Sequence, residues 1–515
     1  MHKKRSAAVA AASFLLISGA AMATAPASYA GTPGGTRASD RNRDFNGDGY
    51  EDVLVGAPGA SVGGRSGAGA VTVQYGGPKG VTTGNARVFS QNTTGVPGAA
   101  ETGDAFGKAV ATGDLDGDGY DDAVIGIPGE DLTGIGTDAG GITVLWGSPN
   151  GLSGANSDWL QSDDAAAGNR FGSALAAGHF TSYVPGDLLA VLDKVGLSIY
   201  QYEAAPQPTA SGDAGATGGG DAGAAPFKPF KNKTRTPLSA QDEAPGITPK
   251  SLTTGDYDDN GLADLVVSGL SEGAEPGYGW SYVILSSDND PLPLIAVRGG
   301  PVVASGDVNG DGFDDLVTGE PHSPDDGGAS TTGGVIGVYY GSPDGPAGQE
   351  GPGTPPVWWT QDTAGVPGVV ERGDGFGTDL SVGDTNRDGY ADVAIGASGE
   401  DIGSVADAGA VWVLRGSAKG LTASGALAVN QNTSYVPGTA EKSDKFGGQV
   451  SFTDPNDDGY YGLLASAPGE NTNDGVVWVF SAGSSGIKLP GSWTFGGGSL
   501  GAPYLDARFG EAIDD

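Results

Sequence analysis

The sequence predicts an all-β protein, a seven-bladed β-propeller with four-stranded antiparallel blades, and three observations support this. The first is composition, because 95 of the 515 residues are glycine, and a glycine inside a helix costs roughly 0.5–1 kcal/mol relative to alanine. The second is an acidic nine-residue loop that recurs along the chain. The third is a set of short apolar runs in phase with that loop, and about four such runs per unit are typical of a propeller blade.

The acidic loop carries Asp or Asn at positions 1, 3 and 5, Gly at position 6 and Asp at position 9. Copies stand at 44–52, 114–122, 256–264, 307–315, 384–392 and 454–462, and the last has Gly462 at position 9. One gap, from 114 to 256, has room for a further unit. A degenerate unit without the acidic loop, at 178–191, fills this gap. The sequence therefore predicts seven units.

Other features keep the same phase. An apolar run follows each loop, as at Val53, and a Phe-Gly pair precedes the next loop at Phe106, Phe171, Phe376 and Phe446. The first unit begins at its acidic loop with no such pair, whereas the chain ends with Arg508-Phe509-Gly510. We therefore expect the C-terminal strand to close the first blade, which leaves the ring without free edge strands.

The chain ends and one internal segment depart from the repeat. Residues 1–30 have a basic start and an apolar centre, as a secretory signal peptide does, so we expect cleavage before Gly31, a linker at 31–40, a propeller at 41–515 and a secreted protein. No later run is long enough to span a membrane. Residues 203–247 are rich in Ala, Gly and Thr and read as a mobile insertion.

Charge and residue inventory exclude several functions. A net charge of −37 argues against nucleic acid as a partner, since such binding needs Lys and Arg to neutralise phosphates. The absence of cysteine excludes disulfides, cysteine-ligated zinc and cysteine nucleophiles. Histidine occurs three times, so a Ser-His-Asp triad has few possible members. We therefore identify no catalytic residue, and the sequence leans against an enzyme.

Oxygen ligands at positions 1, 3, 5 and 9, a Gly at position 6 and a backbone carbonyl at position 7 are typical of a calcium loop, and an all-protein oxygen cage favours calcium over magnesium. An EF-hand is excluded because position 12 is not Glu; a metal-free Asp/Asn/Gly turn is the alternative. We expect about five strong calcium sites and a weak sixth. The candidate ligands are Asp44, Asn46, Asp48, Tyr50, Asp52, Asp114, Asp116, Asp118, Tyr120, Asp122, Asp256, Asp258, Asn260, Leu262, Asp264, Asp307, Asn309, Asp311, Phe313, Asp315, Asp384, Asn386, Asp388, Tyr390, Asp392, Asp454, Asn456 and Asp458.

These units resemble FG-GAP repeats, named for the Phe-Gly pair and for a Gly-Ala-Pro that stands here at 56–58. The chain looks like the seven-bladed propeller of integrin α-subunit heads and of many secreted bacterial proteins. The resemblance implies calcium on one face and partner contacts on the other. The matching partner-face loops are 95–105, 129–139, 365–375, 399–409 and 435–445.

The expected function is a secreted, calcium-binding extracellular binding or adhesion module. We expect a monomer whose partner is an extracellular protein or glycan. The alternative is a glycan- or lipid-directed hydrolase or a lectin-like accessory protein on the same scaffold, for which Trp280 and Trp358 are candidate sugar contacts. The tripeptide Arg372-Gly373-Asp374 is an integrin-recognised sequence, but the repeat itself accounts for its Gly and Asp.

Overall fold

The structure is a computed structural model, which describes residues 43–194, 196–203, 230–237, 245–272, 277–287, 294–322, 333–348 and 353–514. The predicted signal peptide and linker lie outside these residues. Within them, no helix has the length and apolar character that crossing a membrane would require.

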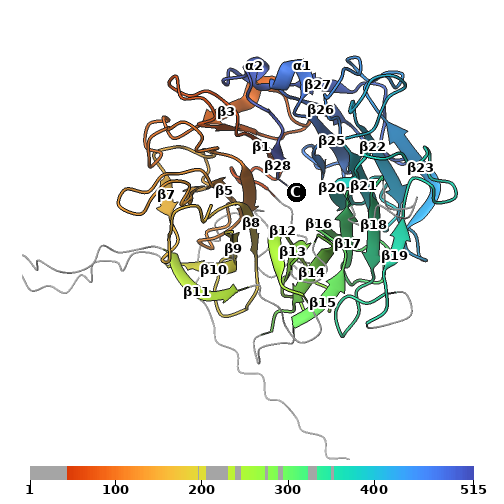
Figure 1. Cartoon of the computed structure of the whole chain (residues 1–515), viewed down its shortest axis with the longest axis horizontal. Coiled ribbons are helices and arrows are strands. Elements are labelled where there is room, and N and C mark those ends of the chain that lie inside the picture. The colour runs from red at the N-terminus through yellow and green to blue at the C-terminus, as the bar shows by residue number, and fades with distance from the viewer. Residues whose placement is uncertain are drawn as a thin grey trace, which may run out of the picture.

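Seven four-stranded antiparallel sheets surround a central axis (Figure 1), which confirms the predicted fold. Blade 1 is formed by β28 (Ala512–Ile513), β1 (Val53–Ala57), β2 (Ala70–Gln74) and β3 (Ala86–Phe89); blade 2 by β4 (Ala109–Gly113), β5 (Asp122–Ile127), β6 (Gly141–Leu145) and β7 (Ser157–Leu160); blade 3 by β8 (Ala174–Gly178), β9 (Leu188–Leu192), β10 (Gly196–Tyr202) and β11 (Phe230–Pro237); blade 4 by β12 (Ile247–Gly255), β13 (Asp264–Ser271), β14 (Gly279–Ile284) and β15 (Leu294–Arg298).

Blade 5 is formed by β16 (Val302–Gly306), β17 (Asp315–Glu320), β18 (Val335–Tyr339) and β19 (Val357–Trp359); blade 6 by β20 (Phe376–Gly383), β21 (Asp392–Ala397), β22 (Ala410–Arg415) and β23 (Thr422–Val429); blade 7 by β24 (Val450–Thr453), β25 (Gly462–Ala467), β26 (Val476–Phe480) and β27 (Trp493–Phe495). The described residues also form three short helices, η1 (Thr83–Asn85), α1 (Glu470–Asn473) and α2 (Gly497–Leu500).

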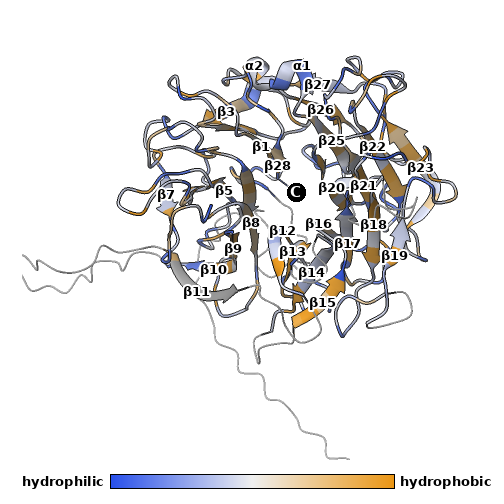
Figure 2. Cartoon of the chain, in the orientation of Figure 1, coloured by the Kyte–Doolittle hydropathy of each residue, from blue (hydrophilic) through white to orange (hydrophobic). Residues whose placement is uncertain are grey.

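The core lies between the blades. The second and third strands of a blade are buried on both faces, as β1 and β2 are throughout, because the two faces pack on neighbouring blades. Val71 of blade 1 and Ile125 of blade 2 belong to one buried cluster that also contains Phe106. Apolar residues reach the rim on β15 and β23 (Figure 2).

In blades 2, 3, 6 and 7 a Phe-Gly pair holds the inner strand against the preceding blade. Phe106 bridges Gly69 in parallel, and Phe446 bridges Gly409 in the same way. A Cβ atom at Gly69 would stand 2.3 Å from the carbonyl oxygen of Phe106, so glycine is needed where the two backbones approach. The repeated Phe-Gly and Gly-Ala motifs are therefore two sides of one contact between blades.

The ring closes as predicted. Strand β28 pairs with β1, with Ile513 opposite Val55, and the Gly510 N–H donates to the Gly56 carbonyl at 2.9 Å. Phe509 takes the place of the other Phe-Gly phenylalanines, because its N–H donates to Asp474 of blade 7 at 3.1 Å. The buried Arg43 adds a further tie, since its Nη1 donates to the carbonyl of Asp514 at 2.5 Å.

Part of the segment 203–247, for which the sequence predicts a mobile insertion, is a strand of blade 3. Phe230–Pro237 forms β11, the outer strand of that blade, and pairs with β10, while Ile247 already begins β12. This strand contains Lys231, Lys233 and Arg235, and the β10 backbone supplies its hydrogen-bond partners. Residues 204–229 lie outside the described residues.

Candidate functional site

The acidic loops lie at one end of the propeller, where each loop leads into the second strand of its blade. In each loop the position-1 carboxylate organises the turn. Asp44 Oδ1 accepts the Gly47 N–H at 2.7 Å and Oδ2 accepts the Gly49 N–H at 2.7 Å. The equivalent bond from Gly119 to Asp114 is 3.0 Å long. The Asp/Asn/Gly pattern therefore folds a tight loop around one carboxylate.

The position-9 carboxylate ties the loop to the blade. Asp52 Oδ2 accepts the Phe45 N–H at 3.0 Å, and its Oδ1 accepts the Gly76 N–H, beyond β2, at 2.8 Å. Asp122 makes the matching bonds with Leu115 and Gly147 at 2.9 and 2.8 Å. Position 9 is thus a structural residue of the blade as well as a candidate ligand.

Two loops bring three carboxylates together. Oxygens of Asp114, Asp116 and Asp122 lie within 4.8 Å of one another, and so do oxygens of Asp256, Asp258 and Asp264. In the second group, Oδ1 of Asp258 is buried and accepts no hydrogen bond from the residues that the structure describes. A buried carboxylate oxygen without a donor is unfavourable, so this group fits a cation.

The loops at 44–52, 307–315 and 384–392 have Asn at position 3, and there an amide oxygen takes the place of the third carboxylate. In the latter two the amide nitrogen donates to position 5, from Asn309 to Asp311 and from Asn386 to Asp388, both at 2.9 Å. At position 7 the N–H donates to position 5, as Tyr50 does to Asp48 at 3.1 Å. The carbonyl ligands expected at Tyr50, Tyr120, Leu262, Phe313 and Tyr390 stay a prediction.

The fifth and sixth loops differ from the others in what surrounds or occupies position 9. Asp392 Oδ2 lies 2.6 Å from Arg415 Nη1, a contact that the sequence did not predict. In the sixth loop Asp454 still accepts the Gly459 N–H at 2.6 Å, but position 9 is Gly462. Both loops keep the turn while offering one fewer uncommitted carboxylate.

The electrostatics of the loops favour a bound cation. Burial, with neighbouring carboxylates adding to it, raises the pKa of Asp52 and of Asp264 to about 8, and raises the pKa of Asp122 and of Asp315 well above its usual range. The pKa of Asp114 rises to about 6 for the same reasons. The ionised form of each group is penalised in the absence of a counter-charge, and a divalent cation would remove that penalty.

The opposite end of the propeller holds three contacts that the sequence did not suggest. Gln91 donates from Nε2 to Glu130 at 2.6 Å, and the same contact recurs 39 residues apart from Gln361 to Glu400 at 2.8 Å and from Gln431 to Glu470 at 2.6 Å. Each joins the end of one blade's outer strand to the next blade. The sequence feature that accompanies these contacts is a Gln-Asn-Thr or Gln-Asp-Thr motif, which recurs in phase with the repeat at 91–93, 361–363 and 431–433.

These glutamates are expected to make stability depend on pH. Burial first, and then the charge of a neighbouring aspartate, raises the pKa of Glu130, Glu400 and Glu470 to about 7. The folded state therefore binds extra protons between pH 4.5 and about 7, and the three groups lower stability as pH rises through that window. The triple variant Glu130→Gln, Glu400→Gln, Glu470→Gln keeps an acceptor for each glutamine and loses the charge.

In saturating calcium, the Tm of this triple variant should exceed that of the wild type at pH 8, and the difference should shrink toward zero near pH 5. Differential scanning calorimetry across that range measures it. The exposed Glu272→Gln is the control and should show no such trend. A Tm difference that does not change with pH would contradict the assignment.

The structure shows the surroundings of three residues that the sequence singled out for other functions. Asp374 of the Arg-Gly-Asp tripeptide is buried, and its carboxylate accepts the Glu371 N–H at 2.6 Å, so it is not displayed to a partner. Trp280 on β14 lies under the guanidinium of Arg298, 5.4 Å from the ring centroid. Trp358 lies on β19 of the next blade and is 39% exposed.

Comparison with known proteins agrees with the fold. The family model for the FG-GAP repeat matches residues 42–73, 106–145, 299–339 and 376–414. The chain is similar to the phosphatidylinositol-glycan-specific phospholipase D of Mus musculus, at 30% identity over 39% of this chain and 22% of the relative. The Rattus norvegicus protein of that name is 31% identical over 37% of this chain and 21% of its own length. The chain thus spans about a fifth of these curated relatives.

Two solved structures also align with the chain. One is Chaetomium thermophilum Sqt1 bound to the N-terminus of ribosomal protein L10, with a TM-score of 0.40, 14% identity and coverage of 74% of this chain and 72% of that one. The other is BBS1N in complex with ARL6DN, with a TM-score of 0.38, 11% identity and coverage of 73% and 79%. Scores this low add nothing to the fold described above.

Proposed function

This chain contains FG-GAP repeats in a seven-bladed β-propeller, and from that premise we propose that it is a secreted, calcium-stabilised extracellular binding module. Calcium binds in the acidic loops at one end of the propeller. A protein or glycan partner binds the loops at the other end. The signal peptide expected at 1–30 supports secretion.

One observation carries the calcium proposal. Three carboxylates of one loop, Asp256, Asp258 and Asp264, place oxygens within 4.8 Å of one another, and Oδ1 of Asp258 is buried without a hydrogen-bond donor among the described residues. Hard oxygen ligands from a single loop are what calcium prefers. When bound, the ion would supply positive charge where the blade buries carboxylates; the hydrogen bonds of Asp256 and Asp264 hold the loop in shape.

The sites should differ in strength. The loops at 114–122 and 256–264 offer three converging carboxylates each and should bind most tightly. The loop at 384–392 should be weaker, because Arg415 already neutralises Asp392. The sixth loop, with Gly462 in place of the ninth ligand, should be weaker still. Affinities of extracellular modules, Kd of roughly 10⁻⁴–10⁻³ M, set the expected range.

Replacing one ligand tests the assignment directly. The variant Asp258→Asn removes one charge from a loop whose turn is held by Asp256, and it should lose about one equivalent of bound calcium in equilibrium dialysis. The exposed Asp344→Asn removes the same charge elsewhere and should bind as the wild type does. Equal calcium stoichiometry for Asp258→Asn and the wild type would contradict the site.

A second candidate function rests on the name of the matched relatives. A phosphatidylinositol-glycan-specific phospholipase D suggests that this propeller acts on, or beside, glycan or lipid substrates. The similarity covers about a fifth of that enzyme, so we propose an accessory role in preference to catalysis. A glycan array with a phospholipase and glycosidase assay on the purified protein separates the two, because turnover would require an active site in this chain.

A further inference from the structure

A large side chain bridges neighbouring blades at the residue that follows the third strand. In blade 1 this residue is Tyr75, whose hydroxyl accepts the N–H of Leu152 from blade 2 at 2.9 Å. In blade 5 it is Tyr340, and a Cβ on Gly420 of blade 6 would meet its hydroxyl at 1.9 Å. In blade 6 the equivalent residue is Arg415, the last residue of β22, which donates to the Ser485 carbonyl of blade 7 at 2.7 Å. Each bridge fills the space between two blades.

Blade 7 lacks this bridge. The equivalent residue is Ser481, one residue after β26, and it is too short to reach blade 1. The segment of blade 1 that it would meet is Gly80-Val81, which corresponds to 151–152 in blade 2. Val81 is 4% exposed, and its N–H donates no hydrogen bond to the described part of the chain. Buried backbone N–H groups without an acceptor are rare.

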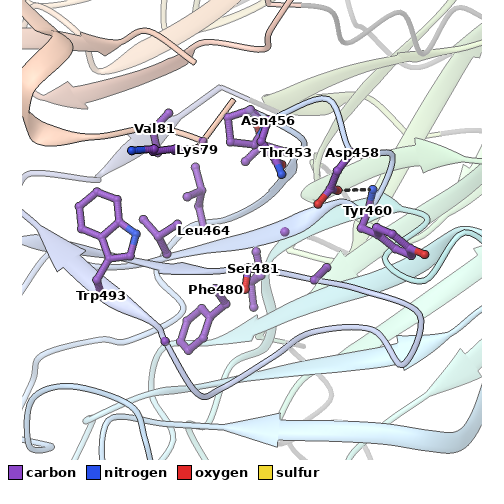
Figure 3. A pocket seen from close by; sticks show the side chains of 17 residues that line it. Lys79, Val81, Thr453, Asn456, Asp458, Tyr460, Leu464, Phe480, Ser481 and Trp493 are labelled. Carbon is purple, nitrogen blue, oxygen red and sulfur yellow. Dashed lines mark hydrogen bonds between the residues drawn. The ribbon is translucent and has the colours of Figure 1, made fainter. Parts of the chain in front are cut away.

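A pocket of about 240 Å³ occupies the place of the missing side chain (Figure 3). Leu464 and Trp493 of β27 line it, and Lys79 and Val81 of blade 1 lie above them in the view (Figure 3). The exposed Ser481 and Asp458 of the sixth acidic loop also line the pocket. The pocket is therefore apolar inside, with one buried donor and charged groups at its rim.

We propose that this pocket binds a phenol, with the aromatic ring between Leu464 and Trp493 and the phenolic oxygen accepting the Val81 N–H. The protein itself shows what the space accepts, because Tyr75 places a phenol in the equivalent position with its oxygen on the Leu152 N–H. A ligand with one acceptor on an otherwise apolar ring matches one buried donor in an apolar pocket. A sugar ring would bury several hydroxyls against Leu464 and Phe480, and each would lack a partner.

The phenol has two possible sources, a free aromatic compound or a tyrosine side chain of a peptide. Ligand-observed NMR titrations of the calcium-saturated protein with p-cresol and with N-acetyl-tyrosinamide separate them. Saturable binding of both is expected, in the millimolar range or tighter. Equal affinities indicate that the ring alone is recognised, and tighter binding of the amide indicates a tyrosine in a peptide. N-acetyl-phenylalaninamide, which lacks the oxygen, should bind several-fold more weakly.

The matched variants are Ser481→Tyr and Ser484→Tyr. Ser481→Tyr restores the bridging residue of blades 1 and 5, so it should reduce p-cresol binding at least tenfold while the Tm stays equal or rises. Ser484→Tyr adds the same side chain at an exposed position of the same loop and should bind normally. If Ser481→Tyr does not fold, Trp493→Leu removes one wall and should weaken binding at least fivefold.

Three results would overturn the proposal. They are the absence of saturable phenol binding by the wild type, binding that neither Ser481→Tyr nor Trp493→Leu alters, and a preference for methyl glucoside over p-cresol. All titrations use calcium-saturated protein. A lack of phenol binding would therefore leave the calcium proposal standing, because calcium binding is measured separately by equilibrium dialysis.

Discussion

Chelating calcium with EDTA should lower the Tm of this protein by roughly 5–10 °C, because about 1 kcal/mol shifts the Tm of a domain of this size by about 1 °C. Ligand binding to the folded state stabilises it by RT ln(1 + [L]/Kd), and with Kd of roughly 10⁻⁴–10⁻³ M a concentration of about 5 mM calcium gives about 1–2 kcal/mol for each site. Several sites together give several kcal/mol.

The control for this experiment is EDTA that has been saturated with calcium, which should leave the Tm unchanged. Magnesium added after chelation should restore little of the stability, since it demands stiffer octahedral geometry and retains its water. A Tm that is the same in calcium and in EDTA would show that the acidic loops are turns held by their own hydrogen bonds.

Removing residues 508–515 should abolish folding to a single stable state. The deletion takes away Phe509, which is fully buried against Phe495 with ring centroids 5.8 Å apart, and Ile513, which pairs with Val55 of β1. It also removes Asp514, whose carbonyl accepts Arg43. An open ring exposes the apolar contact between blades 7 and 1 and leaves β1 as a free edge, which promotes aggregation.

Size-exclusion chromatography and circular dichroism measure this outcome. The truncated chain should elute as aggregate, or should melt in a broad transition well below that of the full chain. The single variant Arg508→Ala is the control, because the Arg508 side chain is more than half exposed, and it should behave like the wild type. A truncated chain that stays monomeric with an unchanged Tm would contradict the closure.

The fold could be predicted from the sequence because the same structural residues recur in phase along the chain. Most units need a tight acidic turn and a close backbone approach, so Asp44 and Gly69 and their equivalents recur in phase. The closure followed from the same regularity, since the Phe-Gly pair missing from the first unit stands at the end of the chain. Even the degenerate third unit was visible as a gap of the right length.

What the sequence could not show depends on contacts between units. Nothing local to Gln91 predicts that it meets Glu130, because the pairing is made by two blades packing side by side. In the sequence Arg415 is an ordinary basic residue at the end of a strand. Only the fold shows that its guanidinium contacts Asp392. The low-complexity composition around β11 concealed a strand that the β10 backbone orders. Ser481 looks unremarkable until it is aligned in space with Tyr75 and Tyr340.

The central claim is that the acidic loops are calcium sites, and anomalous diffraction from crystals grown in calcium tests it most directly. Data collected at a long wavelength should show anomalous peaks within the loops at 114–122 and 256–264, with weaker peaks at 44–52 and 307–315 and the weakest at 384–392 and 454–462. Loops in the same conformation without anomalous density, in crystals grown at 5–10 times the expected Kd of roughly 10⁻³ M, would contradict it.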